Sequence, residues 1–222
     1  MNIFRYNPFS FQEITNNKKM SQIDLYYREF GHGEPFVMLH GNGESSQNFQ
    51  IKDRILAKHF KLIAPDTRGH GNTPCGEAPF TLKQFAQDLY SFLHDNHLNK
   101  VHLLGFSDGA NIAMLFAMDH PELLKSLILN SGNLTPSGMK PNVLKAIKRE
   151  YKKLESMVQT KEVKHQTALL NLMLQEPQID PSELHHINIP TLVIASNNDM
   201  ISRQHTEMIA KSLPNSKLVF IG

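Results

Sequence analysis

The sequence lacks several features that would place it in a special class of protein. It contains a single cysteine, Cys75, and no tryptophan. One cysteine excludes an intramolecular disulfide framework and a cysteine-based metal site, and it is typical of a protein in a reducing compartment. No run of about eighteen apolar residues is present, so the sequence predicts no membrane-spanning helix. The net charge of +2 indicates neither a nucleic-acid nor a membrane partner.

The N-terminal segment also lacks a targeting signal. Residues 1–11 have no apolar core of the length that a signal peptide requires. We therefore expect a cytoplasmic protein. Met20 is an alternative start, because a strand-like pattern begins directly after it. The 222 residues are 40% hydrophobic and 20% charged, which predicts one globular domain over residues 1–222.

Apolar runs of strand length alternate with stretches of helical periodicity along most of the chain. Strands are expected at residues 23–30, 36–39, 61–64, 101–104, 126–129, 191–195 and 217–221, and helices at 46–58, 81–96, 110–117 and 203–212. Parallel strands need a crossover connection, which is usually a helix. The sequence therefore predicts an α/β fold, with a mostly parallel sheet that has helices on both faces.

Residues 134–189 interrupt this alternation because they contain no strand pattern. Two amphipathic helices are expected there, at 139–158 and 161–175, and Pro177 ends the second. This excursion between two strands predicts a short helical cap, residues 134–189, inserted within the domain. Residues 140–164 carry eight lysines and arginines against three glutamates. That excess either steers an anionic substrate or is the solvated face of an amphipathic helix.

A candidate nucleophile lies between the strand at 101–104 and the helix that follows. The segment Gly105-Phe106-Ser107-Asp108-Gly109 has the pattern G-x-S-x-G in the context of strand, sharp turn and helix. Such a turn holds the serine in a strained conformation, and the glycines remove Cβ atoms that would clash. We predict that Ser107 is a catalytic nucleophile at the carboxyl end of the sheet.

A serine nucleophile needs an oxyanion hole. Residues His40-Gly41-Asn42-Gly43 directly follow a buried strand, and their glycines permit a close approach of the backbone to a carbonyl oxygen. We assign the hole to the backbone N–H groups of Asn42 and Asp108. His40 is interpreted as a structural residue rather than a base, because its loop is not placed to meet an acid from a later strand.

The predicted acid is Asp199, in the loop that follows the strand at 191–195. Ligand sites of open parallel sheets form at the carboxyl ends of the strands. The alternative is a turn aspartate that precedes a helix. The order of nucleophile and then acid along the chain favours the catalytic role.

Together these segments resemble the α/β-hydrolase fold, in its group of small-cap serine hydrolases. The resemblance extends from about residue 23 to the end of the chain. Its matching segments are His40-Gly41-x-Gly43, Asp66-x-Arg68-Gly69-His70-Gly71, Gly105-x-Ser107-x-Gly109 and Asp199. Family members with dehalogenase or epoxide hydrolase chemistry have aspartate at the nucleophile position. A serine there implies hydrolysis of an ester, an amide or a carbon–carbon bond, and residues 66–71 are expected to brace the loops of the site.

The resemblance also implies a histidine base in a loop after the last strand, but this sequence ends at Gly222. We therefore predict that the C-terminal end is truncated and that the base follows Gly222. The remaining histidines are poor substitutes: His205 lies on a helix that leads away from Asp199, His165 lies on a cap helix, and His185 and His186 are expected to face solvent. The alternative is a non-catalytic ligand-binding protein of the same fold.

These inferences predict a serine hydrolase, an esterase that acts on a small to medium acyl substrate. Asp108 directly follows the nucleophile, as it does in amino-acid ester hydrolases where this aspartate is linked to amine recognition. An amino-acid ester hydrolase or aminopeptidase that binds an amine through Asp108 is therefore the alternative. An acid at a helix N-terminus is otherwise explained by the helix dipole. We expect no metal and no organic cofactor, and the oligomeric state stays open.

Overall fold

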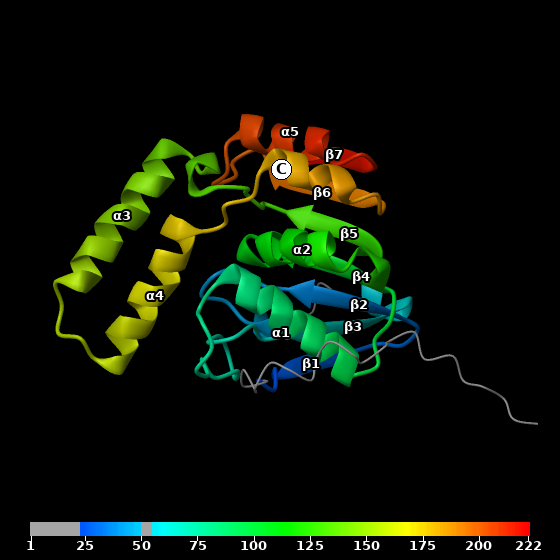
Figure 1. The fold of residues 1–222 in the computed structure, drawn as a ribbon, viewed down its shortest axis with the longest axis horizontal. Coiled ribbons are helices and arrows are strands. Elements are labelled where there is room, and N and C mark those ends of the chain that lie inside the picture. The colour runs from blue at the N-terminus through cyan, green and yellow to red at the C-terminus, as the bar shows by residue number, and fades with distance from the viewer. Residues whose placement is uncertain (1–22, 50–54) are drawn as a thin grey trace, which may run out of the picture.

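The protein is described from a computed structural model that covers residues 23–49 and 55–222. Figure 1 shows a central sheet with strand order β1-β3-β2-β4-β5-β6-β7. The strands are β1 (Tyr27–Phe30), β2 (Glu34–Leu39), β3 (Phe60–Pro65), β4 (Val101–Phe106), β5 (Leu124–Asn130), β6 (Thr191–Ser196) and β7 (Ser216–Ile221). Every neighbouring pair is parallel except β1 with β3. The predicted fold class is confirmed.

Two boundaries at the N-terminal side differ from the sequence-based expectation. The strand expected at 23–30 begins only at Tyr27. The two described ends of the helix expected at 46–58 are 3-10 turns, at Ser46–Asn48 and Leu56–Lys58. Residues 50–54, the segment 1–11 and Met20 lie outside the described residues, so the predictions made for them stay predictions.

The main core lies between the sheet and three helices on one face. These helices are α1 (Leu82–Asp95), α2 (Asp108–Asp119) and α5 (Arg203–Ser212), and their apolar side chains form one cluster with alternate residues of the strands. Thr81 caps α1, since its side chain accepts a hydrogen bond from the backbone N–H of Gln84 at 3.1 Å. A core of this extent fixes the position of every loop at the carboxyl edge of the sheet.

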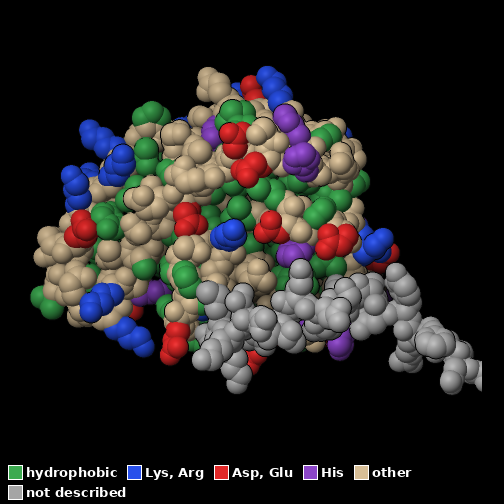
Figure 2. All heavy atoms as spheres, viewed as in Figure 1, with side chains coloured by type: hydrophobic (Ala, Val, Ile, Leu, Met, Phe, Trp, Pro, Cys, Tyr) green, Lys and Arg blue, Asp and Glu red, His purple; other side chains and the backbone are tan. Residues whose placement is uncertain are grey.

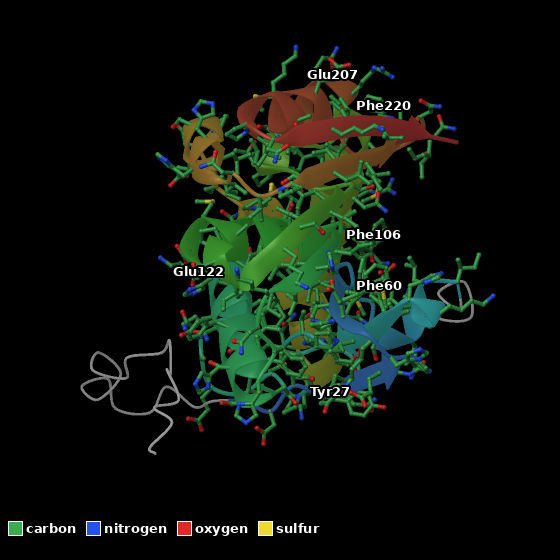
Figure 3. All side chains as sticks on the ribbon, turned by 90° about the vertical axis from the view of Figure 1, so that its right-hand side faces the viewer. Tyr27, Phe60, Phe106, Glu122, Glu207 and Phe220 are labelled. Carbon is green, nitrogen blue, oxygen red and sulfur yellow. The ribbon has the colours of Figure 1, made fainter. Side chains whose placement is uncertain are left out.

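A second, smaller cluster covers part of the opposite face. It contains Phe36, Met38, Leu62 and Ala64, with Phe49 and Leu56 packed against it from the 3-10 segments. In Figure 3, Phe60 and Phe106 lie on this side of the sheet, away from α1 and α2. Apolar residues of the middle strands on this face, such as Ile128 and Ile194, are only half-buried.

The segment 134–189 folds as two α-helices and two 3-10 helices, which are η6 (Pro136–Gly138), α3 (Pro141–Glu155), α4 (Lys161–Gln175) and η7 (Pro181–His186). Leu184 of η7 belongs to the main core, whereas α3 and α4 lie beyond the carboxyl edge of the sheet. Figure 1 shows α3 and α4 as a hairpin that projects from the rest of the molecule. Within 23–49 and 55–222, no helix has the length and apolarity needed to cross a membrane.

Candidate functional site

The turn between β4 and α2 holds Ser107 in a rare backbone conformation. Ser107 has φ 53° and ψ −121°, although positive φ is uncommon for residues other than glycine. Its N–H donates a hydrogen bond to the carbonyl oxygen of Asn130 at the end of β5, at 2.8 Å. Backbone strain of this kind costs on the order of 1–3 kcal/mol and concentrates at functional sites.

The glycines around Ser107 are required by close packing of the backbone. A Cβ atom on Gly105 would overlap the carbonyl oxygen of Gly109, and one on Gly109 would overlap that of Leu39. A Cβ atom on Gly41 would lie 3.2 Å from the Cβ atom of Ser107. The loop after β2 is therefore held directly against the turn that carries the serine.

The carboxylate of Asp199 lies at the carboxyl end of β6 and is buried. One of its oxygens, Oδ2, accepts hydrogen bonds from the Ser131 hydroxyl at 2.5 Å and from the N–H of Ser196 at 3.3 Å. The other, Oδ1, accepts one from the N–H of Ile201 at 3.0 Å. These three donors hold the carboxylate in a fixed orientation.

A pocket of about 250 Å³ brings the adjacent residues Ser107 and Asp108 together with Asp199, which lies far from them in the sequence. Its other walls are apolar side chains, several of them methionines, and small polar residues. The remaining lining residues are Phe106, Ser131, Asn133, Met139, Met173, Glu176, Ser196, Asn198, Met200 and Ile201. The pocket is thus bounded by both the sheet and the cap.

The side chain of Asp108 lines this pocket but is only 7% exposed. The pKa of this carboxyl is raised to about 6, chiefly by burial and also by the nearby Glu176 carboxylate, although the hydrogen bond from Asn42 opposes the shift. The amide nitrogen of Asn42 donates to Asp108 Oδ2 at 2.9 Å and to the carbonyl oxygen of Leu169 at 3.1 Å. Asn42 therefore links the loop after β2 to both α2 and α4.

Glu176 is a pocket residue that the sequence analysis missed. It directly follows α4, is half-buried, and accepts a hydrogen bond from the N–H of Leu82 at 2.6 Å. Burial raises the pKa of its carboxyl group as well. No sequence motif marks this glutamate, because only the packing of the cap brings it to the pocket.

The two residues assigned to the oxyanion hole lie in different elements. Asn42 is in the turn after β2, and Asp108 is the first residue of α2. The first N–H groups of a helix have no intrahelical acceptor and carry partial positive charge, so they suit an anion. The roles of both N–H groups stay predictions.

No histidine lines this pocket in the part of the chain that the structure describes. His40 is buried, donates from Nδ1 to the carbonyl oxygen of Gly41 at 2.8 Å and accepts at Nε2 from the N–H of Thr67 at 3.0 Å. Both ring nitrogens are engaged in the loop itself, as a structural residue requires. Burial lowers the pKa of His40, which keeps its ring neutral.

The other candidate histidines are also occupied or distant. His205 accepts at Nε2 from the N–H of Leu134 at 2.9 Å. His165 on α4 lies 3.7 Å from the Cys75 thiol, measured from Nδ1 to Sγ. His185 and His186 are exposed on η7, as expected. Among the described residues, no group of three or more potential metal ligands is present either.

Residues 66–71 hold neighbouring loops and α1 in place through hydrogen bonds and an ion pair. Asp66 accepts hydrogen bonds from the N–H groups of Ser46 at 2.6 Å and Asn72 at 2.8 Å. Arg68 forms a buried, two-pronged ion pair with Asp88 of α1, at 2.7 and 2.8 Å. These contacts support the architectural role that the sequence analysis gave to this segment.

Comparison with known proteins gives a family match and several relatives. The family model described as "alpha/beta hydrolase fold" matches residues 34–180. Ethanol acetyltransferase 1 of Cyberlindnera jadinii is 38% identical over 100 residues, which are 44% of this chain and 30% of that protein. The (E)-2-((N-methylformamido)methylene)succinate hydrolase of Acinetobacter baylyi is 28% identical over 120 residues, which are 54% of this chain and 44% of that protein. The chain thus spans less than half the length of these relatives.

Solved structures match over most of both chains. An esterase from a marine microorganism superposes with a TM-score of 0.72 at 23% identity, covering 90% of this chain and 91% of the other. The enol-lactonase from Burkholderia xenovorans LB400 gives a TM-score of 0.72 at 18% identity, covering 90% and 88%. At these identities the likeness shows a shared fold.

Proposed function

Because this chain belongs to the alpha/beta hydrolase fold family, we propose that it is a serine hydrolase that cleaves carboxylic esters through an acyl-enzyme. The observation that carries the proposal is Ser107: a non-glycine residue at φ 53°, at the start of a helix, facing the same pocket as the buried Asp199. A turn that stores strain at a serine supports a nucleophilic role for its hydroxyl group.

In the proposed reaction, the Ser107 hydroxyl attacks the ester carbonyl and forms a tetrahedral intermediate. The N–H groups of Asn42 and Asp108 donate to the developing oxyanion, which is worth about 3–4 kcal/mol for one such donor in other enzymes. The intermediate collapses with loss of the alcohol, and water then hydrolyses the acyl-enzyme. Asp199 orients the imidazole that takes and returns the proton.

The position of β7 supports the expectation that this imidazole follows Gly222. Strands β6 and β7 are parallel and pair Ser196 with Ile221, so both end at the same edge of the sheet. The side-chain amide of Asn197 donates to the carbonyl oxygen of Gly222 at 2.7 Å. A residue that followed Gly222 would therefore emerge beside the loop that holds Asp199.

The pocket supports a small acyl group as the substrate. Its volume of about 250 Å³ is below the range of roughly 300–1,000 Å³ that is usual for drug-sized ligands. The apolar side chains of Met139, Met173 and Ile201 suit an aliphatic acyl chain. Either water or an alcohol is proposed as the acceptor of the acyl group, because relatives of this chain are named as alcohol acetyltransferases.

An amine-bearing ester is a second candidate substrate, supported by the charge of the pocket. Asp108, Glu176 and Asp199 line it, and no lysine, arginine or histidine of the described residues does. An ammonium group near Asp108 and Glu176 would offset the cost of burying their charges. The matched pair of propionyl and alanyl esters of one alcohol tests this: Asp108→Asn should lower kcat/KM for the alanyl ester at least tenfold more than for the propionyl ester.

The nucleophile itself is tested by labelling with a fluorophosphonate probe. The protein should be prepared as residues 1–222 and as any longer open reading frame that continues past Gly222. We expect Ser107→Ala to abolish labelling in whichever form is labelled, because the substitution removes the hydroxyl group that reacts with the probe. Ser131→Ala, which changes another pocket serine, should still label at Ser107.

Two outcomes would contradict the proposal. Labelling that persists in Ser107→Ala would assign the reactive group to another residue. Absence of labelling in both lengths of the protein would favour the non-catalytic ligand-binding alternative.

If one form of the protein is labelled, a second experiment distinguishes hydrolysis from acyl transfer. Gas chromatography should compare the products that this form makes with and without added ethanol.

A further inference from the structure

Positive charge is concentrated on the α3–α4 hairpin, defined here as residues 140–164. Its cations are Lys140, Lys145, Lys148, Arg149, Lys152, Lys153, Lys161 and Lys164, against Glu150, Glu155 and Glu162. Among the described residues only one of these cations, Lys153, forms an ion pair, with Glu150 at 2.9 Å. Figure 2 shows the blue side chains gathered at the left, over this hairpin.

The tip of the same hairpin exposes apolar side chains. Met157 and Val158, in the loop that joins α3 to α4, are 46% and 84% exposed. Lysines flank them on both sides, at the end of α3 and at the start of α4. Because the hairpin projects from the body of the protein, its tip can reach an extended surface without obstruction by the sheet (Figure 1).

A groove runs along α3 and is lined by both basic and apolar side chains. It has a volume of about 560 Å³ and is lined by Lys145, Lys148, Arg149 and Lys152 together with Tyr151 and Leu174. Its one carboxylate is that of Glu155. Basic groups around an apolar floor suit a ligand that is both anionic and aliphatic.

We infer that the α3–α4 hairpin docks on an anionic lipid bilayer, with Met157 and Val158 entering the headgroup region and the surrounding lysines contacting lipid phosphates. Helices that lie in a bilayer interface combine apolar residues with lysine and arginine in this way. Clusters of four to eight such cations on an amphipathic helix are sufficient to bind anionic lipid. The net charge of +2 does not indicate this surface, because the positive charges are concentrated on the hairpin while other regions carry the compensating negative charges.

A lipid surface fits these observations better than a nucleic acid does. Phosphate contacts to a nucleic acid require the cations, but they give no reason for an exposed Met157–Val158 pair at the tip. Docking through the hairpin needs no membrane-spanning segment. It is also independent of the reaction at Ser107, so binding can be measured whether or not the protein is active.

Cosedimentation with vesicles tests the inference. Vesicles of phosphatidylcholine alone should bind weakly, and vesicles that also contain phosphatidylglycerol should bind strongly at low ionic strength and weakly at high ionic strength. The triple variant K148E/R149E/K152E should lower the partition coefficient about a hundredfold. The double variant M157D/V158D should lower it about tenfold while the lysines remain.

Matched controls separate the hairpin from the protein as a whole. The triple variant K83E/K100E/K211E changes the net charge equally, at exposed lysines outside the hairpin, and should bind as the unchanged protein does. Ile55→Asp replaces another apolar residue that is 72% exposed and should also have no effect. Thermal melting of each variant checks that it is folded.

Several results would overturn the inference. Equal binding to both kinds of vesicle, no binding to either, or equal losses in the hairpin and control triple variants would each exclude a specific anionic docking surface. Binding of single-stranded RNA that is unaffected by M157D/V158D, without binding to vesicles, would assign the basic residues to a nucleic acid instead.

Discussion

The sheet region and the α3–α4 hairpin differ in where they carry charged residues. The sheet region buries several of them, among which Arg68, Asp88 and Asp108 are each at most 7% exposed. The hairpin exposes them, and most of its lysines have no ion-pair partner among the described residues. A single net charge of +2 describes neither region.

This difference has energetic consequences. A charge in a buried site interacts strongly with its neighbours and is costly without a partner, whereas an exposed charge is screened by water and salt. Individual charged residues should therefore matter to the stability of the sheet region and hardly at all to that of the hairpin. In the hairpin they should matter collectively, through long-range attraction of a partner.

The largest effect is expected from breaking the buried pair of Arg68 and Asp88. Arg68→Met should lower the free energy of unfolding by about 3–5 kcal/mol, because it leaves the Asp88 carboxylate buried without its partner. Denaturant unfolding measures this change. The double variant Arg68→Met/Asp88→Leu should recover most of the loss; an equal loss in both variants would show that packing rather than charge dominates.

At neutral and alkaline pH, Asp108→Asn should raise the free energy of unfolding, whereas Arg68→Met lowers it. The folded-state pKa of Asp108 is raised from 3.8 to about 6, so the folded state binds its proton more tightly than the unfolded state. The resulting penalty is absent below about pH 4, grows between about pH 4 and pH 6, and levels off at about 3 kcal/mol above that range. The stability of the variant relative to the unchanged protein should therefore increase by that amount between pH 4 and pH 8.

Denaturant unfolding of both proteins across this pH range measures the difference directly. Comparing differences between pH values removes any constant effect of the amide on its hydrogen bonds to Asn42 and Asn111. A stability difference that does not vary with pH would mean that the Asp108 carboxyl titrates normally.

Packing within the hairpin should contribute less than packing within the core. Leu154 is the buried residue of α3 and belongs to neither core cluster, so Leu154→Ala should cost about 2 kcal/mol, at the low end for such substitutions. Hydrogen exchange should show faster opening of α3 and α4 with β4 unchanged. Leu103→Ala in β4, where the side chain is fully buried, should instead destabilise the whole domain. If Leu154→Ala also destabilised the whole domain, the hairpin and the core would not differ in this respect.

The smallest effect is expected from the exposed ion pair of the hairpin. Lys153→Ala removes the bond to Glu150 and should change the free energy of unfolding by less than about 0.5 kcal/mol. Lys152→Ala, the neighbouring residue without a partner among the described residues, serves as the control. A loss above 1 kcal/mol for Lys153→Ala alone would show that the hairpin depends on this pair.

The sequence was sufficient to predict the long regular elements and the turn at Ser107. Residues 161–175 and 203–212 form helices with the predicted bounds, because their apolar periodicity and their N-caps are local properties. The turn at Ser107 was predictable for the same reason, since its glycines, the strand before it and the helix after it are contiguous in the sequence. The helix expected at 46–58 was less reliable: its described ends are single 3-10 turns, whose short length gives a weak periodic signal.

Only the tertiary structure decided which distant residues meet at the pocket. Glu176 approaches Asp108, the Asn42 amide reaches Leu169, and the ring of His205 is occupied by the N–H of Leu134. The partners in these pairs are separated by 68, 127 and 71 positions, so no local pattern encodes them. The sequence determined the elements, the turn at Ser107 and the basic residues of 140–164 because those depend on neighbouring residues, whereas the acidic pocket arises from how α4 packs onto the sheet region.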